Sequence, residues 1–274
     1  MVIQHNLQAM DASRLYGINS LNLMKSGEKL GSGYRINRAA DDAAGLAISE
    51  KMRRPIRGLS QASVNCLDGV SLAQTADGAM NEVHDMLHRG TELSIHAANA
   101  TLTDDERDCI QKELDQILNG IEHIQDSCTF NEIHVFRRYG EEEKSIVIQA
   151  GAEGGQDIEM NLPKLDTKTL EIDSVDVRGG PEEAKKAIDK FKHALTYVSE
   201  QRSQMGSYQN RLEHTINNLN NVVENTMSAE SKIRDTNMAM EMVRYSTGKI
   251  LMNSGYSVIA QANQSNLGVM KLLA

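Results

Sequence analysis

The stretch IDKFKHALTYVSEQRSQMGSYQNRLEHTINNLNNVVENTMSAESKI, residues 188–233, places apolar side chains at alternating steps of three and four. It contains no proline and a single glycine, Gly206, and its polar interruptions include Arg202 and Gln209. This spacing predicts one long helix with an apolar seam of period 3.5, the pattern of a coiled coil. Because so narrow a seam cannot be buried alone, the rest of the chain has to provide partner helices. The seam residues are Ile188, Phe191, Leu195, Val198, Met205, Leu212, Ile216, Leu219, Val223 and Ile233.

Two earlier segments have the same spacing. One runs from Leu59 to Ala97 and is rich in small residues, which let a neighbouring helix approach closely. Pro55, just upstream, is expected to end or kink any helix that crosses it. The other follows the cap-like and acidic stretch TLTDDE, residues 101–106, and continues to Cys128. A further cap is expected at Asp41-Asp42, ahead of the helix that contains the first of these seams.

The pattern changes after Phe130. The segments Ser145–Gln149 and Asp157–Asn161 flank the glycine-rich Gly151–Gly155, which predicts a β-hairpin, and alternating apolar residues between Leu170 and Val177 suggest one more strand. Gly179-Gly180-Pro181 then opens the last long helix of the bundle. The predicted fold is therefore mainly α, an elongated antiparallel helical bundle or coiled coil with a small β-hairpin insert at about residues 144–178.

Composition excludes several classes of function. The chain has 274 residues, a net charge of −9, no Trp and 4% aromatic residues, so nucleic acid is not the expected partner and a compact aromatic core is excluded. No apolar run is long enough to span a membrane, and the first residues do not have the pattern of a cleavable secretory signal. The three cysteines fit neither a disulfide framework nor a CxxC metal site. Cys66 and Cys128 fall on the apolar seams and are expected to be small buried hydrophobes.

Both ends of the chain have thin apolar stripes that cannot stabilise a helix alone. They could pair with each other and with copies from neighbouring molecules, whereas a disordered tail is the alternative for the amino end. These stripes predict self-assembly residues at each end, namely Ile3, Leu7 and Met10, and Ile250, Leu251, Val258 and Ile259.

The most enzyme-like feature is His84-Asp85-Met86-Leu87-His88, which places two imidazoles one helical turn apart. A zinc peptidase would need Glu where Asp85 stands, and His96 drifts away from the face of His84. A solvated polar face is the favoured interpretation, with chance metal binding as the alternative. No catalytic, cofactor or metal site is predicted.

Several motifs, in order and at both ends, resemble those of bacterial flagellin. They are HNLQAM (5–10), EKLGSGYRINRAADDAAGLAISEKMR (28–53), IRGLSQAS (56–63), QNRLEHTINNLNNVVEN (209–225), AESKIRD (229–235) and IAQANQ (259–264). The segment IQAGAEGGQDIEMNL (148–162) is similar to the family's hairpin. The resemblance covers nearly the whole chain, which looks like a short form without the variable outer domains. A hook–filament junction protein is the alternative within the same structural class.

The resemblance implies that residues 1–40 and 236–274 form the two halves of an inner-tube domain. It implies a rod domain from residues 41–180, which include the hairpin, and 181–235. The joint motif between the domains would include Arg35, Asp41 and Asp42. The implied function is that of an exported, extracellular subunit of the flagellar filament for swimming motility. The implied partners are other copies of the chain, the export apparatus, a carboxyl-terminal export chaperone, and the filament cap and junction proteins.

The resemblance also implies recognition by the innate receptor TLR5. Arg89 and Leu93 in LHRGTELS (87–94), and Glu113 in IQKEL (110–114), match the family's receptor-binding residues. An Arg and a Leu four apart on a helix would present a charge beside an apolar knob. The alternative is that Leu93 packs against the next subunit's rod. Gly90 and His88 depart from the family's commoner pattern.

Overall fold

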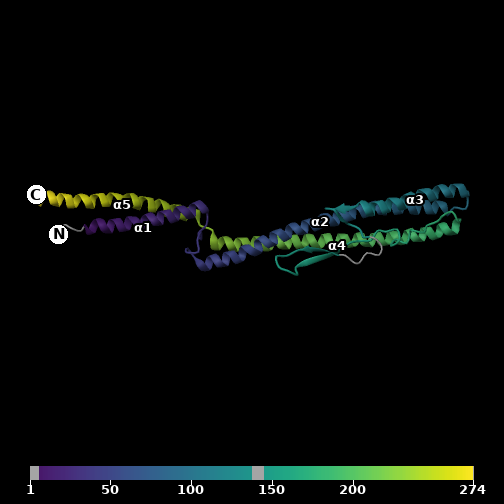
Figure 1. Ribbon diagram of the computed structural model, residues 1–274, viewed down its shortest axis with the longest axis horizontal. Helices are drawn as coiled ribbons and strands as arrows, with labels where there is room; N and C mark the ends of the chain where they lie inside the picture. The colour runs from purple at the N-terminus through teal and green to yellow at the C-terminus, as the bar shows by residue number, and fades with distance from the viewer. Residues whose placement is uncertain (1–5, 138–144, 274) are drawn as a thin grey trace. The chain divides into compact units, whose positions relative to one another are not determined.

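The computed structural model describes residues 6–137 and 145–273, and most of them are helical. Figure 1 shows the element order, and the fold prediction of a mainly α chain with a hairpin insert is confirmed. The elements are α1 (Leu7–Ser32), α2 (Ala43–Ala97), α3 (Asp104–Ser127), β1 (Thr129–Phe130), β2 (Ile133–His134), β3 (Ser145–Gln149), β4 (Asp157–Asn161), α4 (Pro181–Arg234) and α5 (Met238–Leu273).

The chain forms two compact units. One comprises Met1–Arg54 together with Glu224–Ala274, and we call it the terminal unit. The other, the central unit, is Pro55–Val223.

In the central unit α2 and α4 pack antiparallel. Asp77 lies 2.8 Å from Arg202, and Gly90 lies against Phe191, so residue numbers rise along one helix as they fall along the other. Both predicted seams are at this interface, and their buried members include the following side chains: Ala62, Cys66, Val70, Ala73, Ala76, Met80, Val83, Leu87, Leu93, Ala97, Phe191, Val198, Met205, Leu212 and Leu219. The seams of the sequence therefore form the core of this unit.

The helix α3 begins with the predicted cap. The Thr103 hydroxyl accepts a hydrogen bond from the Glu106 amide, and the Glu106 carboxylate accepts one from the Thr103 amide. Arg107, although buried, donates to the carbonyl oxygens of Ala97 at 3.3 Å and Asn99 at 3.2 Å. These bonds satisfy backbone groups at the end of α2 and close the turn into α3.

The additional strand expected between Leu170 and Val177 is absent, so that prediction is wrong. Its alternating apolar residues are buried, but the backbone there is a series of turns with a positive φ at Glu171. Gln111 of α3 takes the place of a neighbouring strand. Its Nε2 donates to the Val175 carbonyl at 3.0 Å, and its Oε1 accepts from the Val177 amide at 2.9 Å. Apolar alternation thus indicated burial correctly but not a strand, because a side chain satisfies the backbone.

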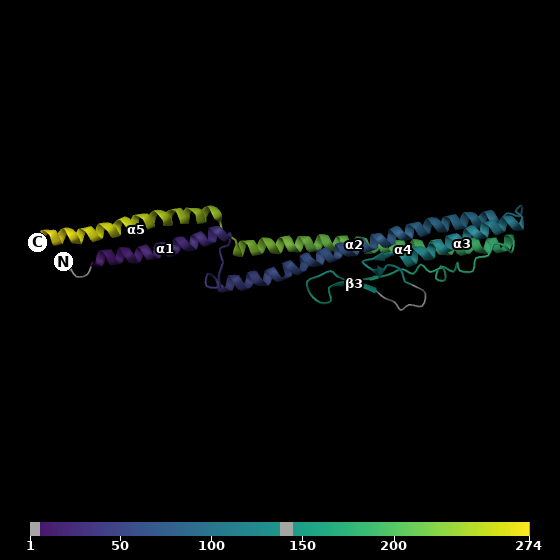
Figure 2. The same cartoon turned by 45° about the horizontal axis from the view of Figure 1, so that its top comes forward.

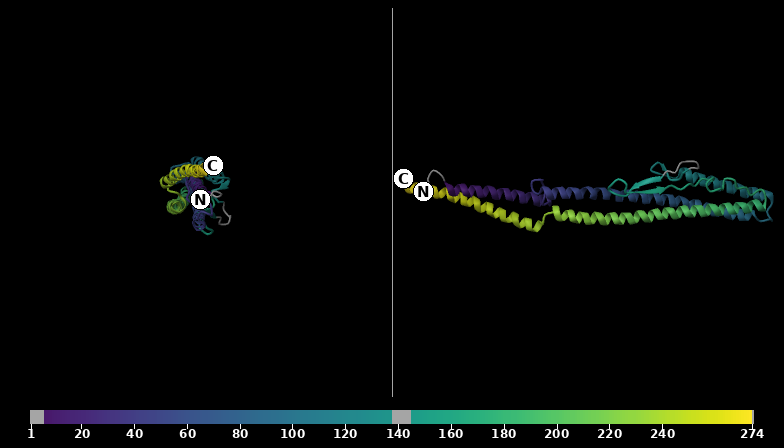
Figure 3. Two further views of the ribbon diagram at one scale, coloured as in Figure 1. Left: turned by 90° about the vertical axis from the view of Figure 1, so that its left-hand side faces the viewer. Right: turned by 90° about the horizontal axis from the view of Figure 1, so that it is seen from below.

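The predicted hairpin is present as β3 and β4, which pair antiparallel from Ser145 opposite Asn161 to Gln149 opposite Asp157. It lies along α2, as Figures 2 and 3 show, where Gly69 provides the space that Ile148 occupies. Asn65 of α2 also donates to the Gln149 carbonyl at 3.3 Å. A second, very short pairing of β1 with β2 was not predicted.

Pro55 does not end a helix, because α2 continues through it from Ala43 to Ala97. A proline removes one backbone hydrogen bond, which a long helix with many other bonds and a buried seam tolerates. The cysteines are all free, and Cys66 is fully buried as expected, while Cys128 is half-buried. Burial raises the pKa of both thiols.

Candidate assembly surface

In the terminal unit α1 and α5 pack antiparallel through small residues. Gly248 lies against Leu23, and Gly255 lies against Tyr16. Near the free end of the pair, the Asn6 side chain donates to the Ala262 carbonyl at 3.0 Å. Figure 3 shows the two helices side by side. At each of these two contacts a glycine of α5 therefore faces a large side chain of α1.

The large apolar residues of this pair point outward instead. Leu7 is 64% exposed and Ile250 is 68% exposed, and no residue of α1 is buried. The other exposed members are Met10, Leu15, Ile18, Leu21, Met24, Met238, Met240, Met242, Val243, Leu251, Tyr256 and Val258. Of the residues predicted for assembly, Ile259 is half-buried and Ile3 lies outside the described residues. An apolar surface of this extent is typical of an interaction site.

The joint consists of the two segments that connect α1 to α2 and α4 to α5. The Arg35 amide donates to the Arg234 carbonyl at 2.6 Å, and the Thr236 amide donates to the Gly33 carbonyl at 2.9 Å. Tyr34 and Asp235 form an antiparallel bridge between these bonds. The Arg35 guanidinium also donates to the Ile233 carbonyl at 2.5 Å. The predicted joint residue Arg35 thus connects the two segments.

Asp41 and Asp42 shape the loop before α2. The Asp41 carboxylate accepts bonds from the amides of Asn37 at 3.1 Å and Arg38 at 3.0 Å, and these bonds lower its pKa, with the Arg38 amide the larger cause. The Asp42 carboxylate accepts from the Gly45 amide at 2.9 Å, which makes it the predicted helix cap.

Arg234 is the centre of the joint, although the sequence pattern did not predict this role. Its guanidinium lies 4.6 Å from the centre of the Tyr34 ring and 3.2 Å from the Glu50 carboxylate. It also approaches Glu230 at 4.0 Å. The signal available in the sequence was its position in the motif AESKIRD, directly before the helix end. One side chain thus joins the start of α2, the end of α4 and the loop after α1.

In the central unit, two of the predicted receptor residues, Arg89 and Glu113, are exposed, whereas the third, Leu93, is buried. Arg89 on α2 and Glu113 on α3 are paired at 2.8 Å, with side chains 53% and 47% exposed, and the bonds to Glu113 and Glu92 raise the pKa of Arg89. Leu93 is only 6% exposed and belongs to the core. The expectation of an apolar knob beside Arg89 is therefore wrong, because Leu93 faces the interior of its own unit.

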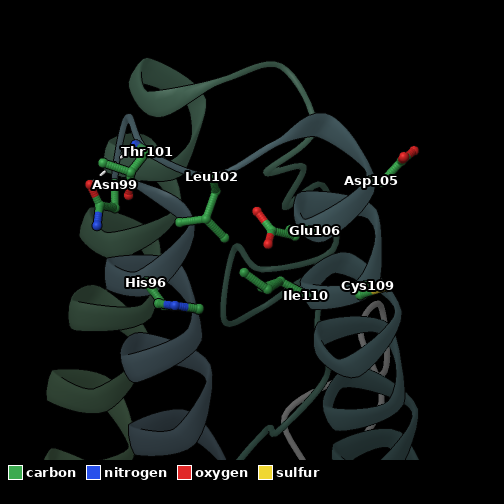
Figure 4. A pocket seen from close by; sticks show the side chains of 8 residues that line it. All are labelled: His96, Asn99, Thr101, Leu102, Asp105, Glu106, Cys109 and Ile110. Carbon is green, nitrogen blue, oxygen red and sulfur yellow. Dashed lines mark hydrogen bonds between the residues drawn. The ribbon is translucent and has the colours of Figure 1, made fainter.

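The end of α2 and the start of α3 border a pocket. Figure 4 shows His96, Leu102, Glu106 and Ile110 around it, with Cys109 at its edge. The Glu106 carboxylate is already used by the helix cap, and its backbone bond with Thr103 is the main cause of its lowered pKa.

Within residues 6–137 and 145–273, no group of three or more His, Cys, Asp or Glu side chains is placed to hold a metal ion. None of the described helices is sufficiently long and apolar to cross a membrane.

Two family models match the chain. One, described as the bacterial flagellin N-terminal helical region, matches residues 3–140, and the other, the bacterial flagellin C-terminal helical region, matches residues 188–273. The chain is 45% identical to a flagellin of Halalkalibacterium halodurans and 40% identical to flagellin FlaB2 of Treponema pallidum, with complete coverage of both chains in each comparison.

Solved structures give the same result. The crystal structure of Bacillus cereus flagellin is 29% identical with a TM-score of 0.50, and the match covers 57% of this chain and 88% of that one. A putative flagellar hook-associated protein from Vibrio parahaemolyticus has a TM-score of 0.60, with coverage of 71% and 100%, but at 14% identity it shows the fold alone. With two family models and relatives that match over their whole length, this chain belongs to the bacterial flagellin family.

Proposed function

We propose that copies of this chain polymerise through α1 and α5 into the core of a flagellar filament. Flagellins are structural proteins of the bacterial flagellum rather than enzymes, and the regions at both ends of this chain match that family. The observation that carries the proposal is the exposure of Leu7, Met10, Ile250, Leu251 and Val258 on a helix pair in which no residue of α1 is buried.

The energy for assembly comes from covering this surface. Burying one large apolar side chain is worth about 1.5–3 kcal/mol, so several per subunit offset the cost of ordering and association. The same surface leaves the isolated pair weakly stabilised, because nearly all its large side chains remain in water. Ordering of the terminal unit is therefore expected to accompany polymerisation.

The experiment compares the full chain with Ile250→Asp by sedimentation and negative-stain microscopy. The critical concentration for filaments should rise about 10- to 100-fold, the equivalent of one lost apolar contact. Asn253→Asp, which adds the same charge at an exposed polar position of α5, should polymerise almost normally. Equal polymerisation by Ile250→Asp and the unchanged chain would contradict the proposal, as would filaments formed without residues 1–40.

The unpolymerised subunit also needs protection of the same surface. We propose that a chaperone covers the exposed apolar residues of α5 before the flagellar export apparatus delivers the chain to the extracellular filament. Cap and junction proteins would then contact this surface at the two ends of the filament. Binding of the carboxyl-terminal chaperone should weaken in Ile250→Asp and not in Asn253→Asp.

A second candidate function is recognition by TLR5. The supporting observation is the exposed ion pair between Arg89 and Glu113, which holds charged groups of two helices in one place. Arg89→Ala should lower signalling in a reporter-cell assay at least about tenfold, as loss of an anchoring Arg does at interfaces. Arg178→Ala is the matched control, since Arg178 pairs with Asp108 at 2.9 Å and is equally exposed. Equal signalling by all three proteins would exclude these residues.

A further inference from the structure

Two histidines on α2 are in direct contact. The ring centres of His84 and His88 lie 4.5 Å apart at an angle of 78°. His84 is half-buried against the central unit and His88 is exposed, so one ring is held while the other can turn. Neither ring has a role in the assembly surface described above.

From this geometry we propose that His84 and His88 form a two-ligand site for a borderline divalent transition ion such as Ni²⁺ or Zn²⁺. Side chains four residues apart on a helix are neighbours on one face. Imidazole nitrogens bind these ions at about 2.0–2.1 Å, so the two nitrogens lie at most about 4.2 Å apart. Adjustment of the exposed His88 ring brings the pair into that range.

The surroundings define what kind of site this is. Arg202 of α4 contributes positive potential at His84, but its guanidinium is bound to Asp77 at 2.8 Å, and Asp85 contributes negative potential. Among the described residues no third ligand completes the set, so water fills the remaining positions. The site is therefore an exchangeable surface site rather than a closed structural one. Imidazole ligands also favour Ni²⁺ and Zn²⁺ over Mg²⁺ and Ca²⁺.

Chelation would bridge one turn of α2, the helix that carries most of the central seam. An ion that binds only the folded helix stabilises it by mass action. The thermal midpoint of the central unit should therefore rise with Ni²⁺ concentration, while Mg²⁺ at the same concentration should have no effect.

The test is calorimetric titration of the full-length, unpolymerised chain with Ni²⁺ and with Zn²⁺ at pH 7.5. His84→Ala and His88→Gln should each lower the affinity about tenfold or more, because the second ligand's effective concentration is lost. His193→Ala is the matched control, since it removes an exposed histidine of α4 that has no second histidine one turn away. Circular dichroism without metal verifies that the variants fold.

Three results would overturn the proposal. They are unchanged affinity in both His84→Ala and His88→Gln, an equal loss in His193→Ala, and equal binding of Mg²⁺. A folded His88→Gln variant whose thermal midpoint still rises with Ni²⁺ concentration would also contradict the proposal.

Discussion

The central and terminal units are both mainly helical but use their apolar residues in opposite ways. In the central unit, large side chains such as Phe191, Leu87 and Leu212 are fully buried. In the terminal unit, Ile36 and Ala262 are the only buried apolar residues among the described side chains. The central unit therefore has a hydrophobic core of its own, whereas the terminal unit exposes the apolar residues that could form one.

The difference shows that helical pattern and burial are separate properties. Both regions have apolar residues at steps of three and four, yet no residue of α1 is buried and most large apolar side chains of α5 are exposed. The pair therefore leaves most of its large apolar side chains exposed.

The largest effect is expected from a core variant of the central unit. Phe191→Ala should lower the free energy of unfolding of the monomer by about 3–5 kcal/mol, because it removes a fully buried ring and leaves a cavity. Ile250→Ala should change it by less than about 0.5 kcal/mol, as an exposed side chain does. Denaturant unfolding followed by circular dichroism measures both. Similar losses in the two variants would abolish the distinction between the units.

A smaller effect is expected where α2 approaches α4. A Cβ at position 90 would lie 2.6 Å from the Phe191 ring, so Gly90→Ala should destabilise the monomer by about 1–3 kcal/mol. Gly78 has open space around it, and Gly78→Ala should stabilise the helix by up to about 1 kcal/mol. The two variants should change the free energy of unfolding in opposite directions in the same assay. A change in the same direction would show that position 90 is not a close contact.

Within the terminal unit, the joint should contain the most stable local structure. Arg234→Ala should destabilise it by about 1–2 kcal/mol, because the stacking on Tyr34 and the ion pair with Glu50 are both lost. Hydrogen exchange at the Arg35 and Thr236 amides reports the opening. Arg14→Ala, which removes an exposed ion pair with Asp11 on α1, should leave these amides unchanged.

A smaller loss of stability is expected in the central unit when the cap of α3 is removed. Thr103→Ala removes the acceptor for the Glu106 amide and should cost about 1 kcal/mol. Thr101→Ala, two residues earlier, lies outside the capping box and is the control. Thermal unfolding of the two variants gives the comparison, and equal midpoints would mean that the cap contributes little.

The smallest effect concerns pH at the joint. The pKa of Asp41 is lowered in the folded protein from its ordinary value of 3.8, so its contribution to stability is present above that value. The contribution is lost as the pH falls below 3.8 through the folded pKa. Exchange at the Asn37 and Arg38 amides should therefore increase in that range, after correction for intrinsic rates. In Asp41→Asn this pH dependence should flatten, and an unchanged profile would assign it to another group.

Part of the fold could be predicted because it depends on local spacing. The seam of α4, the cap at Thr103 and the hairpin strands β3 and β4 appear in the structure where the sequence placed them. The spacing of apolar residues wrongly predicted a strand at Leu170–Val177. There the side chain of Gln111, which is distant in the chain, forms the backbone hydrogen bonds that a neighbouring strand would have formed. Of the two outcomes expected at Pro55, an end or a kink, the end is excluded, because the packing of the rest of a long helix outweighs one missing hydrogen bond.

For the candidate sites, the sequence alone determined which residues are apolar, which are charged and how they repeat. It also determined the family, since the motifs at both ends are read directly from residue order. Only the tertiary structure decided that Leu93 is buried while Leu7 and Ile250 are exposed, and that Arg234 centres the joint. The physical reason is that a helical period defines a face, but only contacts with residues distant in the chain decide what that face meets.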